Sequence, residues 1–269
     1  MAKARQTKSM EVPVQIPVCK IGSNDLIAAL KEGFEDFKAQ RGDLVLIGML
    51  YVAVGLVTAL VATGTAILPL VFPLFAGIAL LGPLVATGFY ELARRREDGL
   101  ESRWWHFFFV LKNKSFEDIA VVGIFLIAIF GAWIASAALI YALCFGAMAP
   151  ASPSAFIQQV LFTLPGWMMI VFGNLIGVVF AVLALAIGVV SLPLLVDRKF
   201  NASVAISTSI RAARHNPAAM AQWGAMVAGL LILGSIPMFL GLAVVLPVLG
   251  YATWHLYTKM IDRSALTMD

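Results

Sequence analysis

Long apolar runs alternate with short charged segments along the chain. Three runs contain no Asp, Glu, Lys or Arg: those between Asp43 and Glu91, between Asp118 and Asp197, and between Arg214 and Lys259. A helix needs about 20 apolar residues to cross the hydrocarbon core of a bilayer, so each run has room for two crossings and a turn. The pattern predicts an all-α integral membrane protein with six transmembrane helices arranged as three hairpins.

Turn-forming residues set the expected limits of these helices. Gly64 lies between two threonines in the first run, and Pro237 closely follows Gly234 in the third. A longer connection at 146–166, with three prolines, divides the middle run and includes apolar residues at 156–161 that suit a short helix in the headgroups. The predicted spans are approximately 44–62, 66–90, 119–144, 167–196, 217–233 and 236–257.

An amphipathic segment precedes each predicted hairpin. In residues 24–41 the apolar side chains share one helical face, which describes a helix lying along the inner leaflet: Leu26, Ile27, Leu30, Phe34 and Phe37. Residues 104–109 and 201–214 have the same character, and Asn201 is the expected cap of the latter segment. Ser115 with Asp118 is the expected cap of the span at 119–144. We expect a mobile tail at 1–22, an interfacial helix at 23–43, a transmembrane domain at 44–258 and a cytoplasmic tail at 259–269.

The basic residues predict the orientation of the chain. All nineteen Lys and Arg fall before residue 44, between 91 and 118, between 197 and 214, or from Lys259 onward, and the three opposite connections have none. Positive charge favours the cytoplasmic side of a membrane. We therefore expect a multi-pass protein of the bacterial inner membrane with both termini in the cytoplasm.

Composition supports a membrane location and argues against other classes. The chain is 61% hydrophobic and 13% charged, whereas soluble domains are about 45–50% apolar and about 25% charged. The net charge of +4 is explained by topology, so we expect no nucleic-acid partner. Cys19 and Cys144 lie in unlike segments, and we expect both to be free thiols. A secretory signal peptide is not predicted, because 43 largely polar residues precede the first apolar run.

Two hairpins contain a similar pattern of proline and glycine. Pro73, Gly77 and Pro83 align without gaps on Pro237, Gly241 and Pro247, and Pro193 keeps part of the pattern in the middle hairpin. This predicts a parallel internal repeat of three units, each an inner helix followed by two crossings. The alternative is that Pro and Gly are simply common in membrane helices. If the repeat is real, the even helices bend near Pro83, Pro193 and Pro247.

Candidate functional residues are few. Asn174 is the clearest polar residue deep in a predicted span, and Gly173 and Gly177 flank it; close helix packing with a bond across the contact is favoured over substrate binding. The histidines His106, His215 and His255 all belong at the inner interface, with His255 an expected anchor. We expect no cofactor, no metal and no catalytic residue, because the usual motifs are absent.

The cluster Arg94, Arg95 and Arg96 lies beside a predicted span, with Trp104 and Trp105 close behind. Topology alone explains such a cluster, and contact with anionic lipid headgroups on the cytoplasmic side is a compatible, sharper interpretation. Membrane lipids are therefore an expected partner.

Several segments together resemble the DUF2189 family of predicted bacterial integral membrane proteins. They are Asp-Leu at 25–26, Gly-Phe-Glu-Asp-Phe at 33–37, Phe-Pro-Leu at 72–74, Leu-Gly-Pro at 81–83, Tyr-Glu at 90–91, Ser-Leu-Pro-Leu-Leu-Val-Asp-Arg at 191–198, Leu-Pro at 246–247 and Gly-Tyr-Ala-Thr-Trp-His-Leu-Tyr at 250–257. The resemblance covers roughly residues 20–260. The family's function is not established, and some members are labelled cytochrome c oxidase subunits. A catalytic oxidase subunit needs intramembrane histidines, which this chain lacks.

These observations favour a non-enzymatic accessory, assembly or scaffold component of a larger membrane complex, with a respiratory complex suggested by the resemblance alone. The alternative is a small-solute transporter or lipid-handling protein whose cavity is lined by scarce polar groups such as Thr87, Ser136, Asn174 and Ser191. A membrane-embedded enzyme is the third and least favoured reading.

Overall fold

The structure is a computed structural model that describes residues 16–39, 49, 68–146, 150–237 and 239–266. These residues form an all-α arrangement, apart from an isolated bridge between Val18 and Ile261. The predicted first span at 44–62, apart from Met49, and most of the predicted N-terminal tail lie outside the described residues.

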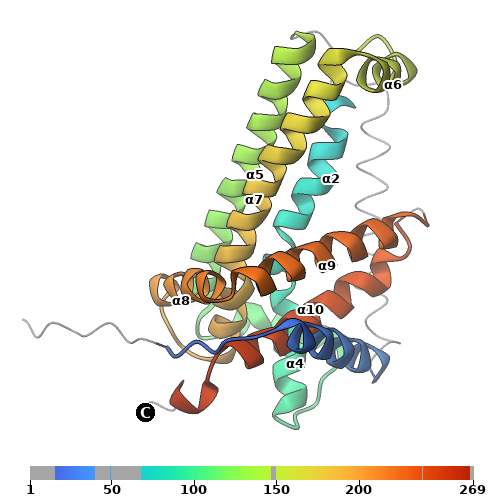
Figure 1. Cartoon of the computed structure of the whole chain (residues 1–269). Coiled ribbons are helices and arrows are strands. Elements are labelled where there is room, and N and C mark those ends of the chain that lie inside the picture. The colour runs from blue at the N-terminus through green and yellow to red at the C-terminus, as the bar shows by residue number, and fades with distance from the viewer. Residues whose placement is uncertain (1–15, 40–48, 50–67, 147–149, 238, 267–269) are drawn as a thin grey trace, which may run out of the picture.

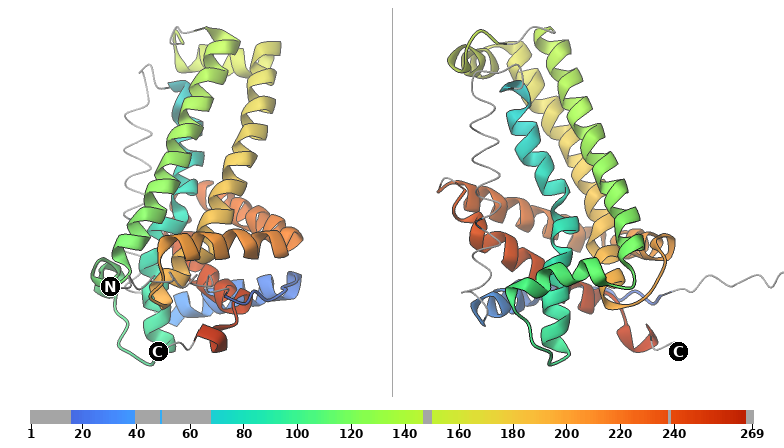
Figure 2. Two further views of the ribbon diagram at one scale, coloured as in Figure 1. Left: turned by 90° about the vertical axis from the view of Figure 1, so that its left-hand side faces the viewer. Right: turned by 180° about the vertical axis from the view of Figure 1, so that it is seen from behind.

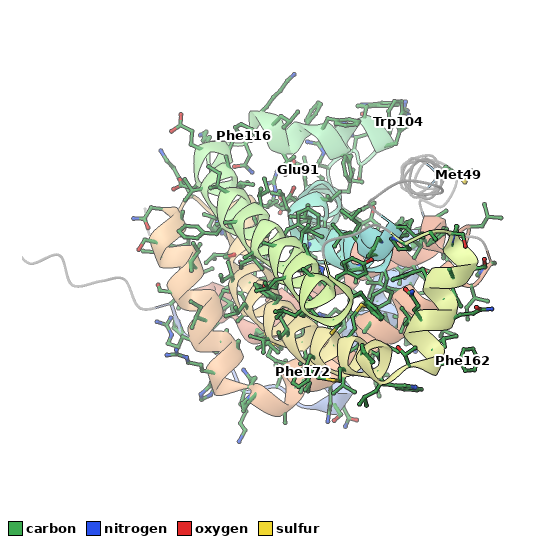
Figure 3. The ribbon with its side chains drawn as sticks, turned by 90° about the horizontal axis from the view of Figure 1, so that it is seen from above. Met49, Glu91, Trp104, Phe116, Phe162 and Phe172 are labelled. Atoms are coloured by element: carbon green, nitrogen blue, oxygen red, sulfur yellow. The ribbon has the colours of Figure 1, made fainter. Side chains whose placement is uncertain are left out.

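A long antiparallel hairpin dominates the fold. It consists of α5 (Phe116–Phe145), α6 (Pro153–Phe162) and α7 (Leu164–Asp197), and α5 and α7 run side by side in Figures 1 and 2. Both helices are long and apolar enough to span a membrane, and the other described residues leave their outward faces largely uncovered. The α6 helix occupies the predicted connection, and Figure 3 places Phe162 at the periphery of the molecule.

The two ends of this hairpin differ in charge. Asp118 and Asp197 lie at one end, which we call the charged end, and no Asp, Glu, Lys or Arg occurs between them in the sequence. The opposite end, which we call the α6 end, is uncharged. The two ends therefore reproduce the one-sided distribution of charge that the sequence predicts for a spanning hairpin.

A broken helix packs beside α5 and α7. It begins with η1 (Leu68–Leu70) and continues as α2 (Val71–Leu80), α3 (Gly82–Val85) and α4 (Thr87–Glu97). Pro83 lies in the first turn of α3, where its missing N–H costs least, so the break at Leu81 precedes it. The described part of the predicted span at 66–90 is thus a series of helical segments, interrupted near the expected bend at Pro83, and its last helix extends to Glu97.

The C-terminal helices lie across the charged end. They are α8 (Ala202–His215), α9 (Pro217–Ser235), α10 (Leu242–Met260) and η3 (Arg263–Leu266). The Asn201 side chain accepts a hydrogen bond from the Val204 amide, which confirms the predicted cap. In Figures 1 and 2, α9 and α10 run obliquely to α5 and α7 instead of alongside them. Of the helices in the described part, α9 is a third candidate span, and α10 is not one.

The packed core is concentrated at the charged end. The largest fully buried side chains include Trp223, Tyr251, Trp254 and Tyr257, and Tyr90 of α4 lies among them. The helix at 23–39 packs onto this core, and η2 (Trp104–Lys112) leads from α4 to α5. The charged end of the protein is therefore well packed, and the apolar α5–α7 hairpin projects from it.

The structure does not confirm the six-crossing repeat. Pro73 lies within α2 whereas its sequence counterpart Pro237 lies in a turn, and Pro83 follows a helix break whereas Pro247 lies inside α10. The predicted capping of α5 is also wrong. Ser115 makes no side-chain cap, and the Asp118 carboxylate instead accepts a hydrogen bond from the Ala202 amide at 2.8 Å, which ties α5 to α8.

Candidate functional site

A cluster of paired charges lies where the helix at 23–39, α4, α10 and the end of α7 meet. Its acidic members are Glu32, Asp36, Glu97 and Asp197, and its basic members are Arg96, His255, Lys259 and Arg263. We call this set the charged cluster. Because its members come from distant parts of the sequence, only the folded chain assembles it.

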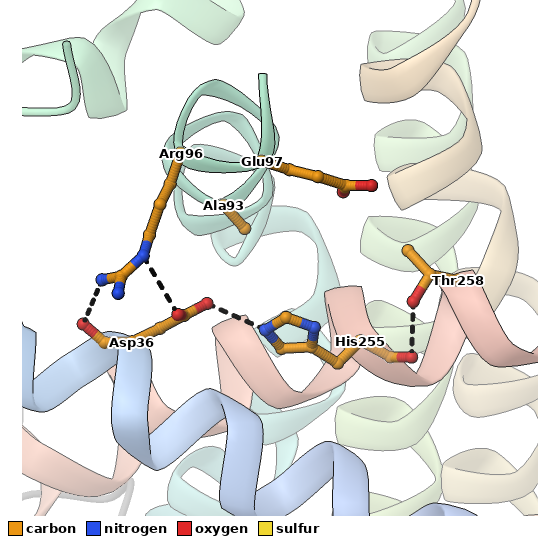
Figure 4. Close-up of a pocket in the computed structure, with 6 residues that line it drawn as sticks. All are labelled: Asp36, Ala93, Arg96, Glu97, His255 and Thr258. Carbon is orange, nitrogen blue, oxygen red and sulfur yellow. Dashed lines mark hydrogen bonds and ion pairs between the residues drawn. The ribbon is translucent and has the colours of Figure 1, made fainter. Parts of the chain in front are cut away.

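One half of the charged cluster surrounds a shallow hollow of about 360 Å³. Asp36 lies at its centre: its carboxylate is 3.3 Å from Arg96 Nε and 2.8 Å from His255 Nε2 (Figure 4). Ala93, Glu97 and Thr258 complete the lining. The hydroxyl of Thr258 donates to the His255 carbonyl, so it strengthens α10 and is not directed at a ligand.

Glu32 closes the other side of His255. It lies 3.3 Å from His255 Nδ1, and both of its oxygens accept hydrogen bonds of 2.9 Å from Lys259 Nζ. The imidazole is therefore held between two carboxylates one helical turn apart. This arrangement fixes the position of the helix at 23–39 on α10 through charge as well as packing.

The second half of the cluster fixes the end of α7. Asp197 accepts hydrogen bonds of 3.0 and 3.2 Å from Arg263 and one of 2.7 Å from the Tyr257 hydroxyl. Arg263 also pairs with Glu97, whose other oxygen accepts a hydrogen bond from Trp254 Nε1 at 3.1 Å. Both Arg263 and Asp197 thus have several partners, which is the arrangement that offsets the cost of burying charge.

A third group of charges lies along α4. The buried Glu91 accepts hydrogen bonds of 2.8 and 3.1 Å from Arg94, and Arg94 also reaches Asp98 at 3.2 Å. Arg95 donates to the Glu101 carbonyl and lies over the ring of Phe109. Glu91 is thus buried and paired within the protein, although it follows directly on a long apolar run.

His106 lies next to this group. Burial, together with the positive charge of Arg95, lowers the pKa of His106, and its Nδ1 accepts a hydrogen bond from the Arg103 amide. The neutral imidazole is therefore the form that fits the folded protein. It acts as a local brace for η2.

The chemistry of these groups favours a static role. Each ionised side chain in the charged cluster has an oppositely charged partner, so none is aimed unpaired into the hollow. Within the described ranges, no group of three or more His, Cys, Asp or Glu is placed to hold a metal ion. Fixed ion pairs of this kind stabilise one arrangement of helices, which suits a clamp better than a proton relay.

The predicted basic cluster is divided among protein partners. Arg94 pairs with Glu91, and Arg95 donates a hydrogen bond to the Glu101 carbonyl. Arg96 pairs with Asp36. The rings of Trp104 and Trp105 are partly exposed, with Arg103 lying over Trp105. The two indoles are thus more exposed than the side chains of Arg94 and Arg95 and about as exposed as that of Arg96, and lipid contact stays a prediction.

The predicted packing residues lie on α7. Gly177 faces Trp133 of α5, where an added Cβ would come within 3.2 Å of the indole. Gly173 has no atom within 4 Å of such a position, and Asn174 is exposed, with its amide donating to the Ile170 carbonyl of its own helix. Pro83 lies in the first turn of α3, directly after the helix break at Leu81, whereas Pro193 and Pro247 lie inside α7 and α10, where bending stays a prediction.

Sequence reasoning missed most of the charged cluster. Glu32 and Asp36 lie outside the predicted apolar face of the segment 24–41, yet they face α10 and α4. Ile27 and Phe34, expected on the apolar face, are exposed, and the helix packs through Leu26, Gly33 and Phe37 instead. The spacing of the two acids by four residues was the available signal, but it did not identify their basic partners.

Comparison with known proteins gives one match. Residues 71–197 match the model of the family DUF2189, described as a predicted integral membrane protein. The matched segment runs from α2 to the end of α7 and includes the whole α5–α7 hairpin. No curated protein and no solved structure matches the chain.

Proposed function

We propose, starting from the match of residues 71–197 to the DUF2189 family of predicted integral membrane proteins, that the chain is a non-enzymatic accessory, assembly or scaffold component of a larger membrane complex. We place it in the bacterial inner membrane, with the charged end in the cytoplasm, because the described basic residues lie in segments at that end and positive charge favours the cytoplasmic side. A respiratory complex is the partner suggested by the family resemblance.

The observation that carries the proposal is the contrast between the two parts of the molecule. The charged cluster joins four helices through paired charges, whereas the described residues leave most of the apolar surface of the α5–α7 hairpin uncovered. A rigid base that projects an apolar hairpin is suited to holding that hairpin against other membrane helices. Lipid covers whatever part of this surface the partner leaves free.

The scarce polar groups of the apolar region give little support to a transport role. Ser136, Asn174 and Ser191 each donate a hydrogen bond to a carbonyl one turn earlier in their own helix, and Thr87 donates to the Leu84 carbonyl. A hydroxyl or amide bonded in this way does not need a ligand. These groups therefore do not form a polar pathway, and no feature of the described residues favours a transporter.

Native mass spectrometry after mild detergent extraction tests the proposal. We expect the chain to appear in a complex of fixed stoichiometry with another membrane protein. Recovery of the chain alone, or only with lipids, in every mild detergent tried would contradict the accessory role. A visible absorption band in the purified chain would contradict its non-redox character.

Alanine substitutions on the exposed faces then show where the partner binds. Ile124 and Phe125 of α5 and Val178 and Val182 of α7 are each at least half exposed, so their truncation should change the stability of the chain itself by less than about 0.5 kcal/mol. A substitution that releases the partner while leaving the thermal midpoint unchanged identifies the interface. If none of the four has this effect, these faces contact lipid only.

A further inference from the structure

The turn of the α9–α10 hairpin presents a group of exposed apolar side chains. They are Ile232, Leu233, Ile236, Leu240 and Val244. The opposite end of the same hairpin is buried in the protein, where Trp223 of α9 and Tyr251 and Trp254 of α10 are almost inaccessible. The hairpin therefore has a base packed into the core and an apolar tip with no covering from the described residues.

A contact between two stacked rings shows the position of this tip along the length of the α5–α7 hairpin. Phe239, in the turn, stacks on Phe75 of α2 with ring centroids 5.0 Å apart and an angle of 13° between the planes. Phe75 lies between Pro73, whose carbonyl accepts a 2.7 Å hydrogen bond from Trp133, and Gly77, which also adjoins Trp133. The tip of the hairpin is thus level with Trp133 of α5.

Trp133 lies near the middle of α5. At 1.5 Å per residue, it is about 25 Å from the first residue of α5 at the charged end and about 18 Å from the last residue at the α6 end. If α9 and α10 crossed the membrane completely, their turn would lie near the α6 end. Its contact with Phe75 instead places it halfway along the α5–α7 hairpin.

Both ends of the α9–α10 hairpin are held at the charged end. Asn216, just before α9, accepts a hydrogen bond from the Ile21 amide and donates one to the Cys19 carbonyl, while Lys259 at the end of α10 pairs with Glu32. The segment between Arg214 and Lys259 contains no Asp, Glu, Lys or Arg. The hairpin therefore leaves the charged end and returns to it without carrying charge.

The backbone of the tip is compatible with a hydrocarbon environment, where an unpaired N–H or C=O is costly. The amides of Phe239, Leu240 and Leu242 donate to carbonyls within the turn at 2.9 to 3.1 Å, and the Ser235 hydroxyl donates to the Leu231 carbonyl at 2.7 Å. The two arms also meet closely, because a Cβ on Gly241 would lie 2.7 Å from the Gly234 carbonyl oxygen. These amides and the Ser235 hydroxyl are thus paired within the hairpin itself.

We propose that α9–α10 is a re-entrant hairpin that enters one leaflet from the charged side, turns near the middle of the bilayer and returns to the same side. Its partner is the acyl-chain region of that leaflet, which the five exposed side chains of the tip contact. The hydrocarbon core is about 30 Å thick and α9 is about 28 Å long, so a helix that stops halfway must lie obliquely. This is the orientation of α9 in Figures 1 and 2.

Spin-label depth measurements in vesicles test this proposal. In a full-length chain carrying Cys19→Ser and Cys144→Ala, single cysteines replace Ile236 at the tip, Ile127 on the exposed face of α5, Phe162 near the α6 end or Ser207 on α8. Each labelled protein is reconstituted in phosphatidylcholine–phosphatidylglycerol vesicles. The ratio of collisions with oxygen to collisions with a water-soluble nickel chelate reports the depth of each label.

We expect the ratio at Ile236 to match that at Ile127 and to exceed the ratio at Ser207 several-fold. A ratio at Ile236 that matches Phe162 or Ser207 would place the tip at a membrane surface and overturn the proposal. A second label at Leu240 checks that the result belongs to the tip and not to one substitution. Equal thermal midpoints across the labelled proteins show that the fold is retained.

Discussion

Gly33 allows the helix at 23–39 to pack directly against the backbone of α10. A Cβ at this position would lie 2.5 Å from the backbone nitrogen of Ala252 in α10 and 2.7 Å from its Cα. Ordinary contacts begin near 3.4 Å, and a backbone atom cannot rotate away as a side chain can. Gly33→Ala should therefore force the helix at 23–39 away from α10.

The size of the effect follows from that displacement. Relief of the clash needs a shift of about 1 Å, which forfeits a quarter to a half of the dispersion energy across the contact. Overpacking of this kind costs about 1–3 kcal/mol, while replacing a helical glycine by alanine returns up to about 1 kcal/mol. The shift also stretches the ion pairs that Glu32 and Asp36 make with α10, so we expect a net loss of about 1–2 kcal/mol.

Thermal unfolding in detergent, followed by tryptophan fluorescence, measures this loss. Tryptic cleavage at the exposed Lys31 and Lys38 reports separately on docking of the helix and should become faster in Gly33→Ala. Gly229→Ala on α9 is the matched control, because an added Cβ there meets no atom within 4 Å. A Gly33→Ala protein with the midpoint and cleavage rate of the control would refute the close packing described above.

Three further changes test the polar contacts. Asn216→Ala removes a buried amide with three hydrogen bonds and should cost about 2 kcal/mol, seen as a fall in the thermal midpoint; no fall would contradict its bracing role. In a double-mutant cycle, Asp197→Asn and Arg263→Gln should show a coupling of about 1–3 kcal/mol, whereas additive effects would show that their pairing stabilises nothing. The pKa of His106 in the folded protein lies below the unfolded value near 6.5, so the stability that the neutral imidazole contributes is present above that pH and is lost on further acidification. His106→Gln should therefore weaken the fall in folding stability at acidic pH.

The sequence predicted the parts of the fold that depend on hydropathy and local capping. The α5 and α7 helices lie within three residues of their predicted limits, α6 fills the expected connection, and Asn201 caps α8. Each of these features depends on residues close together in the chain. The positions and lengths of these helices could therefore be predicted from the sequence without knowing how the helices pack against one another.

The arrangement of the remaining helices could not be read in this way. Hydropathy made 236–257 look like a span, but it contains no information on the angle at which α9 and α10 meet α5 and α7. The charged cluster was missed for a related reason. Asp36 and His255 are separated by 219 residues, and a pairing of that kind depends on tertiary packing.

The central claim is that the α5–α7 hairpin spans the membrane with the charged end on one side, and the sidedness of two thiols tests it most directly. Cys19 is exposed at the charged end, and Ser154 of α6 is exposed at the other. In a Ser154→Cys, Cys144→Ala chain, a membrane-impermeant maleimide should label residue 154 in intact spheroplasts and Cys19 only in inverted vesicles. Labelling of both thiols from the same side of a sealed membrane would contradict the account.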